Sequence, residues 1–134
     1  MEEPFEILEH TADVGFRVRG GSVAELFENA ARALASFTLE DGGGAAVRVV
    51  ELRGEDYESL LVNWLSEVLY LLDTGQFKPR QFQVESIRPD HLRARLTGGA
   101  GPAQWRLIVK AVTYHQIEVK EKDGRWEATV YLDV

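Results

Sequence analysis

The chain has 134 residues, of which 45% are hydrophobic and 28% charged, a balance typical of one folded domain spanning residues 1–134. Twenty-two acidic and fifteen basic residues give a formal net charge of -7, which excludes a sequence-wide basic footprint for nucleic acid. The absence of cysteine excludes disulfides, thiolate nucleophiles and metal centres with cysteine ligands.

Targeting signals are missing from the same sequence. No apolar run approaches the ~20 residues that a membrane-spanning helix needs. The opening residues MEEP lack the basic and apolar regions of a signal peptide. We therefore expect a cytoplasmic protein that has no membrane partner and that contacts RNA only indirectly, through another protein.

Two strands and a helix are predicted at the start of the chain. Residues 5–8 begin the first strand, and apolar residues alternate with arginines over 16–19 to give the second. The alternation breaks between them. Ser22 and Glu25 have the spacing of a capping box, which can satisfy two backbone donors at a helix start. Apolar residues at three- and four-residue spacing then predict an amphipathic helix near residues 23–38.

A second helix is predicted after a strand over residues 46–52. Asp56 is the expected N-cap, and apolar side chains recur on one stripe from Tyr57 until Gly75 supplies a stop. Helix-to-sheet core explains this stripe better than a cofactor groove does, because a globular helix needs one such face for packing.

The rest of the chain is β in character. A strand pair with a turn at residues 88–90 is followed by alternating apolar residues over 107–119 and 126–134. Asp123 and Gly124 separate these two runs, and an Asp-Gly pair in this position is typical of a two-residue hairpin turn.

The hairpin register predicts which face each side chain occupies. Counting outward from the turn places His115 opposite Leu132, on the core-side face. Tyr114 then lies opposite Asp133 on the other face, roughly four residues or about 13 Å from Lys110. A β-bulge anywhere in the hairpin would overturn this assignment.

The order of elements predicts an α+β fold. Two one-sided helices among mainly antiparallel strands favour a two-layer sandwich, in which both helices pack on one face of a single antiparallel sheet.

Acidic residues near both ends of the chain are candidate metal ligands. His10 and Asp13 are three residues apart, and Asp133 with the carboxylate of Val134 forms a terminal acidic pair. Oxygen ligands suit Ca²⁺, Mg²⁺ or Mn²⁺, and an added imidazole suits zinc. A turn aspartate that bonds its own backbone and a solvated terminal aspartate remain the commoner explanations.

The other candidate side chains do not indicate an enzyme by themselves. His115 in an apolar row is typical of a hydrogen-bonded core-edge histidine, and Lys110 of a solvated lysine. Phosphate-binding loops, serine-hydrolase elbows and zinc-peptidase motifs are absent from the sequence.

Five segments together resemble the archease family. They are HTADVG at 10–15, LFENAA at 26–31, LLVNWL at 60–65, VKAVTYH at 109–115 and LDV at 132–134. The similarity extends over nearly the whole chain, in the family's order. It implies a non-catalytic accessory protein for an RtcB-type RNA ligase, which acts in tRNA splicing, tRNA processing and RNA repair. Such a protein promotes guanylylation of the ligase by GTP, and so supports multiple turnover.

The resemblance also assigns roles to residues. It implies a site for a divalent metal ion (calcium, magnesium or manganese) formed by Asp13, Asp133 and the Val134 carboxylate. It implicates Lys110 in activating the ligase. The candidates for ligase activation or contact are Lys110, His10 and His115.

Two other function classes stay open. One is a small metal-dependent hydrolase that uses Asp13, Asp133 and His115, although the expected core-side placement of His115 counts against it. The other is a general protein chaperone, against which the sequence shows no exposed apolar stripe beyond the core positions.

Overall fold

The computed structural model describes residues 4–9, 13–39, 44–75 and 77–134. Along these residues, seven strands and two helices follow the predicted order. They are β1 (Phe5–Glu9), β2 (Asp13–Gly20), α1 (Val23–Ala35), β3 (Ala46–Arg53), α2 (Tyr57–Thr74), β4 (Lys78–Arg88), β5 (His91–Gly99), β6 (Ala111–Lys122) and β7 (Arg125–Asp133).

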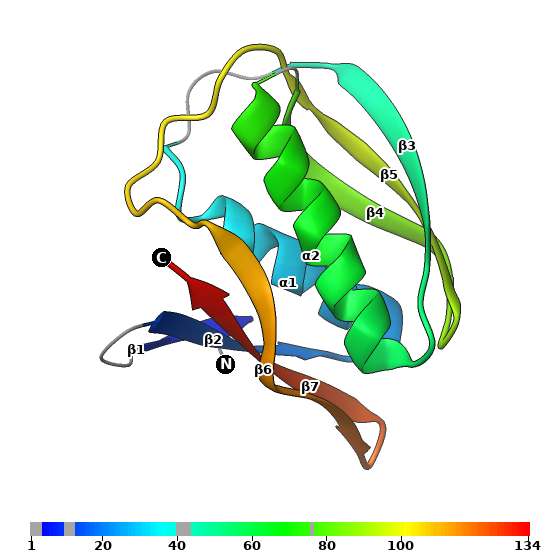
Figure 1. Ribbon diagram of the computed structural model, residues 1–134. Coiled ribbons are helices and arrows are strands. Elements are labelled where there is room, and N and C mark those ends of the chain that lie inside the picture. The colour runs from blue at the N-terminus through cyan, green and yellow to red at the C-terminus, as the bar shows by residue number, and fades with distance from the viewer. Residues whose placement is uncertain (1–3, 10–12, 40–43, 76) are drawn as a thin grey trace.

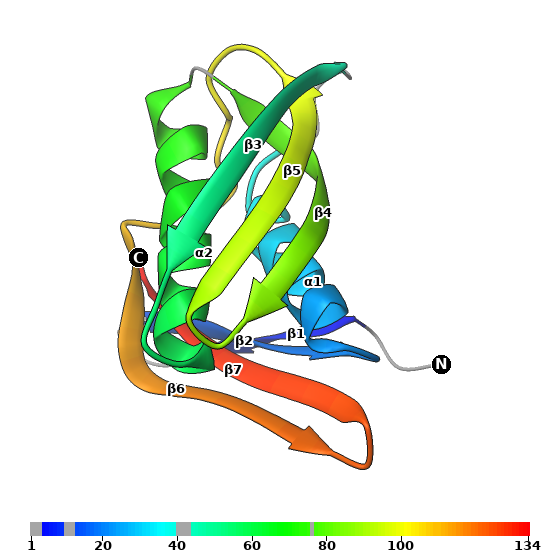
Figure 2. The same ribbon diagram turned by 90° about the vertical axis from the view of Figure 1, so that its right-hand side faces the viewer.

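The strands form two antiparallel sheets, where a single sheet was expected. One sheet has the order β1-β2-β7-β6, and the other has the order β3-β5-β4. Figure 2 shows the three-stranded sheet standing beside the helices while the four-stranded sheet crosses below them. The α+β class and the antiparallel pairing are confirmed.

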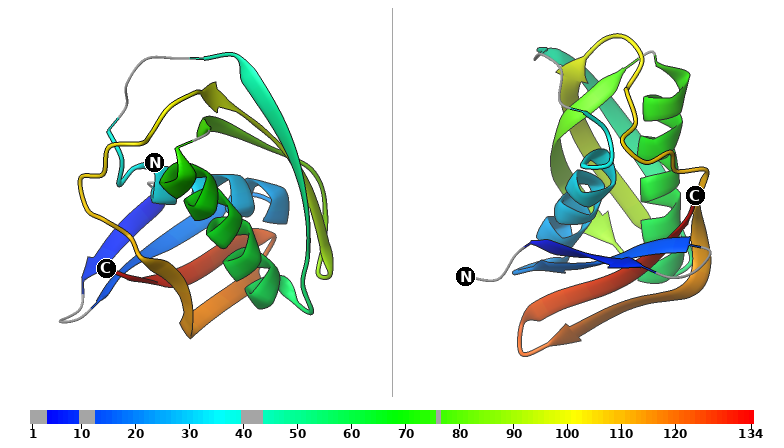
Figure 3. Two further views of the ribbon diagram at one scale, coloured as in Figure 1. Left: turned by 45° about the horizontal axis from the view of Figure 1, so that its top comes forward. Right: turned by 90° about the vertical axis from the view of Figure 1, so that its left-hand side faces the viewer.

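Both helices lie between the two sheets (Figure 1), and the views in Figure 3 agree. Helix α1 contacts β2 and β4, and α2 contacts β6 as well as β3 and β4. The single-sheet prediction failed because each helix is buried over a wider arc than one stripe. Helix α2 also buries Val62 and Leu71, and α1 buries Ala33. A helix that is apolar on two sides needs two packing partners.

Trp64 joins the layers. Its ring is fully buried in α2, and its Nε1 donates a hydrogen bond of 2.8 Å to the carbonyl oxygen of Phe27 in α1. The edge of the ring meets Phe82 of β4, with centroids 6.1 Å apart. The predicted core role of this side chain is confirmed, and its polar atom has a partner as burial requires.

The caps of both helices follow the sequence signals. The Ser22 side chain accepts from the backbone N–H of Glu25, although the Glu25 carboxylate accepts in turn from the N–H of Gly21 rather than from that of the N-cap. At the start of α2, Asp56 and Ser59 form the reciprocal capping box. Gly75 ends α2 in the left-handed region with φ 70°, where glycine is favoured.

Each helix also covers one sheet edge with a carboxylate. Glu28 of α1 accepts a 2.8 Å hydrogen bond from the N–H of Val84 in the edge strand β4. Glu58 of α2 does the same for Val119 in the edge strand β6, at 3.1 Å. These bonds satisfy N–H groups that would otherwise be open to pairing with another chain.

Within the part of the chain that the structure describes, neither helix is long and apolar enough to span a bilayer.

Candidate functional site

The two aspartates singled out from the sequence face each other. Asp13 is the first residue of β2 and Asp133 the last of β7, and they are direct partners in the antiparallel ladder. The second strand therefore begins earlier than the predicted residue 16, because pairing with β7 extends β2 back to Asp13. Opposite residues in such a ladder project to the same face, with Cβ atoms about 4.5–5.5 Å apart. Asp133 is exposed and Asp13 half-buried.

Lys110 lies beside this aspartate pair. Its backbone N–H donates a 2.7 Å hydrogen bond to the carbonyl oxygen of Asp133, and its side chain is exposed. The separation expected from the hairpin register is therefore wrong. Residues 13, 110 and 133, which are distant in sequence, meet at one end of the four-stranded sheet.

A bulge in β6 causes this departure from the predicted hairpin register. Pairing from the turn runs as predicted as far as Glu118 opposite Thr129, then resumes at Thr113 opposite Tyr131. Four residues, 114–117, thus oppose the single residue Val130, which shifts the register by three. Gln116 takes a φ of 53° inside the bulge, a strained conformation that alternation in the sequence does not reveal.

The shifted register changes the partners at the end of the hairpin. Leu132 pairs with Val112 rather than with His115, and Asp133 pairs with Ala111 rather than with Tyr114.

His115 lies on the surface, so its expected core-side placement is wrong. Its ring meets the edge of the Tyr131 ring, with centroids 5.9 Å apart. Its backbone N–H donates to Oγ1 of Thr113, and that hydroxyl donates to the carbonyl oxygen of Tyr131. The bulge is thereby attached to β7 next to the aspartates.

Tyr131 is a supporting residue that pattern reasoning missed. Its ring lies against Gly15, where an added Cβ would come within 2.7 Å of the ring carbon Cδ1. Tyr131 pairs with Gly15 across the ladder and is 7% exposed. A glycine inside a strand is the sequence signal of such a close approach.

Two predicted site residues remain, Val134 and His10. Val134 is half-buried and packs against the core. His10 lies outside the described residues, so its proposed role stays a prediction.

The facing carboxylates of Asp13 and Asp133 supply two of the ligands that a hard cation needs. Across residues 4–9, 13–39, 44–75 and 77–134, no three His, Asp or Glu side chains come together as a metal site. Two facing carboxylates do come together, and like charges directly opposite in a ladder repel. Carboxylate oxygens are the ligands of Ca²⁺, Mg²⁺ and Mn²⁺, and water commonly completes their coordination.

Another ion network lies on the three-stranded sheet, away from these residues. Arg93 contacts Glu51 at 2.6 Å and Glu85 at 3.1 Å. The hydrogen bond from Arg93 holds the pKa of Glu51 below its ordinary value. The exposure of all three side chains is typical of surface stabilisation rather than of a reactive centre.

Comparison with known proteins gives the family. The model of the archease protein family matches residues 5–134. Protein archease of Methanosarcina mazei is 39% identical over 139 residues, covering 97% of this chain and 95% of that protein. The chain belongs to the archease family. Protein archease of Archaeoglobus fulgidus is 37% identical, covering 97% of this chain and 98% of its own length.

Solved archease-like structures have the same fold. The solution structure of Methanobacterium thermoautotrophicum protein 1598 matches with a TM-score of 0.80 at 37% identity, covering 98% of this chain and 99% of that one. A Thermotoga maritima archease, described as a possible chaperone, matches with a TM-score of 0.69 at 19% identity, covering 100% and 98%. The second similarity concerns the fold alone.

Proposed function

We propose that this archease is a non-catalytic accessory protein that activates an RtcB-type RNA ligase, promoting guanylylation of the ligase by GTP and multiple turnover. The supporting observation is the meeting of Asp13, Asp133 and Lys110 at one end of the four-stranded sheet. The family resemblance selected these three residues from separate motifs. A shared location is what a single docking surface requires. RNA is reached only through the ligase.

The proposal includes a divalent metal ion, either calcium, magnesium or manganese. Asp13, Asp133 and the Val134 carboxylate would hold it, and the ion would supply positive charge for orienting phosphate oxygens. Binding would also relieve the repulsion between the facing aspartates.

Lys110 and His115 have roles on the same surface. The Lys110 ammonium would pair with a phosphate or with a ligase carboxylate. His115 would contact the ligase from the bulge, where its ring is exposed beside Tyr131.

The test is guanylylation of a purified, active cognate ligase with GTP and Mn²⁺, with this protein at substoichiometric amounts. We expect more guanylylated ligase and more turnovers with the parent protein. Asp13→Asn should lower the stimulation at least tenfold. Asp90→Asn is the matched control, because it removes an exposed turn carboxylate that pairs only at the surface with Arg88.

Two results would contradict the proposal. One is an unchanged rate with the parent protein, and the other is full stimulation by a folded Asp13→Asn variant. Thermal unfolding of each variant verifies that it is folded.

A general chaperone is the second candidate, because large apolar side chains flank Lys110. Leu107 is 36% exposed, Ile108 65% and Tyr114 59%. The prediction that no such surface exists was wrong, since the bulge and the segment before β6 turn these side chains outward. Protection of unrelated proteins from aggregation, lost in Ile108→Ser, would favour this candidate over ligase activation.

The hydrolase has less support. The exposure of His115 removes the earlier objection to it. Among the described side chains, however, His115 does not join Asp13 and Asp133 in a metal-binding group of three.

A further inference from the structure

Helix α1 packs beside β4, an edge strand of the three-stranded sheet (Figure 2). Two contacts fix the direction of the helix relative to the strand. Glu28 of α1 accepts from the N–H of Val84, and Arg80 of β4 donates to the hydroxyl of Thr38, which lies just beyond the end of α1. The helix and the strand therefore run in opposite directions along this edge.

The N–H of Phe82 points out of the sheet at the same edge. Residues 82–84 pair with β5 in regular succession, and in an antiparallel ladder alternate residues direct their N–H groups to the same side. Because the Val84 N–H bonds to Glu28 outside the sheet, the Phe82 N–H also points away from β5. Within the described part of the chain, no group accepts a hydrogen bond from it.

Arg32 is the residue of α1 that lies abreast of Phe82. It follows Glu28 by four residues, so it lies on the same side of the helix, about 6 Å further along. Phe82 precedes Val84 by two residues, which is about 6–7 Å along the strand. The helix thus offers a carboxylate to one outward N–H and a guanidinium beside the next. Two donors side by side require an acceptor from elsewhere.

An open pocket of about 360 Å³ surrounds this point of the edge. Its lining residues are Arg32, Arg80, Gln81, Phe82, Gln83, Arg95 and Thr97. Gln83 is the direct ladder partner of Arg95, and Gln81 that of Thr97, so these four side chains project to one face of the sheet. The Phe82 side chain is buried on the opposite face, against Trp64, so Phe82 contributes its backbone to the pocket.

The charge of the pocket is opposite to that of the chain. Its three arginines give a formal charge of +3, and no carboxylate is among its described lining residues. The whole chain carries -7. The fold thus gathers cations and neutral polar side chains at one place on an acidic protein.

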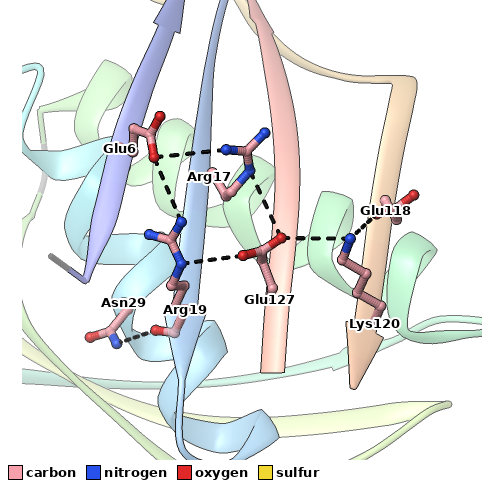
Figure 4. Close-up of polar contacts among 7 residues, drawn as sticks. All are labelled: Glu6, Arg17, Arg19, Asn29, Glu118, Lys120 and Glu127. Atoms are coloured by element: carbon pink, nitrogen blue, oxygen red, sulfur yellow. Dashed lines mark hydrogen bonds and ion pairs between the residues drawn. The ribbon is translucent and has the colours of Figure 1, made fainter. Parts of the chain in front are cut away.

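Arg32 is held in place by a neutral acceptor. Its Nη1 donates a 2.6 Å hydrogen bond to Oδ1 of Asn29. Asn29 is itself buried, and its Nδ2 donates to the carbonyl oxygen of Arg19 at 2.8 Å (Figure 4). In the described part of the chain Arg32 has no carboxylate partner. The amide therefore orients the guanidinium without cancelling its charge.

The other two arginines are also held at the pocket. Arg80 donates to the Thr38 hydroxyl at 2.9 Å and to the Leu39 carbonyl oxygen at 2.7 Å, and both of these acceptors are neutral. Arg95 contacts Glu85 at 3.4 Å, but Glu85 also contacts Arg93, at 3.1 Å. One carboxylate shared by two arginines leaves a net positive charge beside the pocket.

Arginines on the four-stranded sheet are paired differently. Arg17 and Arg19 contact the Glu127 carboxylate at 3.8 and 3.2 Å, as Figure 4 shows, and both contact Glu6 at 3.7 Å. Carboxylates of this chain thus neutralise those two arginines. At the β4 edge, the corresponding acceptor for Arg32 has to come from a ligand.

Guanidinium groups that converge with a backbone N–H match a phosphate group. A phosphate monoester carries about −1.5 to −2 charges at pH 7 and has three acceptor oxygens. Arginine binds such oxygens through two parallel N–H groups. A carboxylate has one charge and two oxygens, so it would leave part of the charge of the three arginines uncompensated.

We propose that this pocket binds a phosphate dianion, with Arg32 and the Phe82 N–H as its central donors and Arg80 and Arg95 beside them. The same dianion occurs as inorganic phosphate and as the phosphate group of an organic monoester. The proposal does not depend on ligase activation, since Asp13 and the other residues of that site belong to the four-stranded sheet.

The experiment is a titration of the full chain with inorganic phosphate at constant ionic strength, followed by NMR. We expect saturable shifts at the Phe82 amide and at the Arg32 Nε–H. Arg32→Gln should bind phosphate at least tenfold more weakly, and glutamine preserves the helix because it is a good helix former. Arg53→Gln is the matched control, since it removes an exposed cation of the same sheet outside the pocket. It should leave the affinity unchanged.

A second variant tests the site with a different charge change. Gln83→Glu adds a carboxylate to the pocket at an exposed position, so it should also weaken phosphate binding at least tenfold. Thermal unfolding verifies that each variant is folded. Absence of saturable binding to the parent protein would overturn the proposal, and so would unchanged affinity in folded Arg32→Gln or Gln83→Glu.

Comparison ligands test the charge and the source of the anion. Acetate and dimethyl phosphate, which each carry one negative charge, should bind at least tenfold more weakly than phosphate. Equal binding of either would overturn recognition of a dianion. Glycerol 3-phosphate distinguishes the sources: binding at least as tight as that of inorganic phosphate supports an organic monoester as the ligand, and weaker binding supports the free ion.

Discussion

At the scale of single residues, Gly15 has more influence than its lack of a side chain suggests. It lies two residues after Asp13 in β2, and the Tyr131 ring occupies the space above it. That ring in turn contacts His115 on the bulge. Gly15 therefore leaves room for the Tyr131 ring, which packs between β2 and the His115 side chain on the bulge.

Replacing Gly15 with alanine should destabilise the protein. The new Cβ would lie 2.7 and 2.8 Å from two carbons of the Tyr131 ring, which must then move. We expect a loss of about 1–3 kcal/mol in the free energy of unfolding, the usual cost of overpacking. Urea unfolding measures it. Gly21→Ala is the control, because its Cβ would meet only the Glu25 carboxylate, at 3.8 Å. Equal stability of both variants would show that Tyr131 yields without cost.

The candidate site also shows the limit of residue-level prediction. Asp13, Asp133 and Lys110 were selected by family resemblance, since their types and spacing alone favoured ordinary surface roles. Their proximity follows from the β2–β7 pairing, which joins segments more than 100 residues apart, and from the shifted register of the β6–β7 hairpin. No local signal carries that information.

At the scale of elements, the helices were the most predictable parts. Helix α2 begins and ends where its cap residues indicated, because the caps satisfy backbone groups within the same few residues. Helix α1 begins as predicted but ends at Ala35 rather than near residue 38. The next residues continue in turns and also bond to the segment before β6, as in the hydrogen bond from Arg106 N–H to the Phe37 carbonyl.

Asp73 in the last turn of α2 should make stability depend on pH. Burial raises the pKa of its carboxyl group above the ordinary value. The folded state therefore holds this proton more tightly than the unfolded state, and stability falls as pH rises through the titration of Asp73. The negative end of the helix dipole also disfavours the carboxylate.

Asp73→Asn should consequently stabilise the protein at pH 7, by about 0.3–1 kcal/mol given the exposure of the side chain. The gain should shrink as pH falls, because protonated aspartic acid is also neutral. Urea unfolding at pH 7 and at pH 4 measures the difference. A gain of the same size at both values would assign the effect to something other than charge.

The β6 bulge is the element that sequence reasoning missed. Alternation continues through 111–119 in the sequence, so nothing there marks the three extra residues. The bulge moves His115 to the surface and brings Lys110 to the aspartates. A short-range pattern predicted the turn at Asp123 and Gly124, whose φ values of 55° and 78° suit a hairpin of this type.

At the scale of the whole molecule, the two sheets share one helical layer. Leu34 is fully buried in α1, which contacts both β2 and β4. Neither sheet can keep its apolar face dry without the helices. The two sheets should therefore unfold in one cooperative transition.

Leu34→Ala tests this coupling. The cavity should lower the free energy of unfolding by about 2–5 kcal/mol. Hydrogen exchange read at the Ala94 amide in one sheet and the Val130 amide in the other should show the same loss of protection. A loss confined to one sheet would show that the sheets unfold separately.

The sequence by itself determined the α+β class, the helix positions, the hairpin turn and the family. Each of these depends on local periodicity, capping chemistry or short motifs. The tertiary structure decided that there are two sheets, that a bulge shifts β6, and that the aspartates meet Lys110. These features depend on pairings between distant segments, and the free energy of such contacts is set by the packing of the whole chain rather than by neighbouring residues.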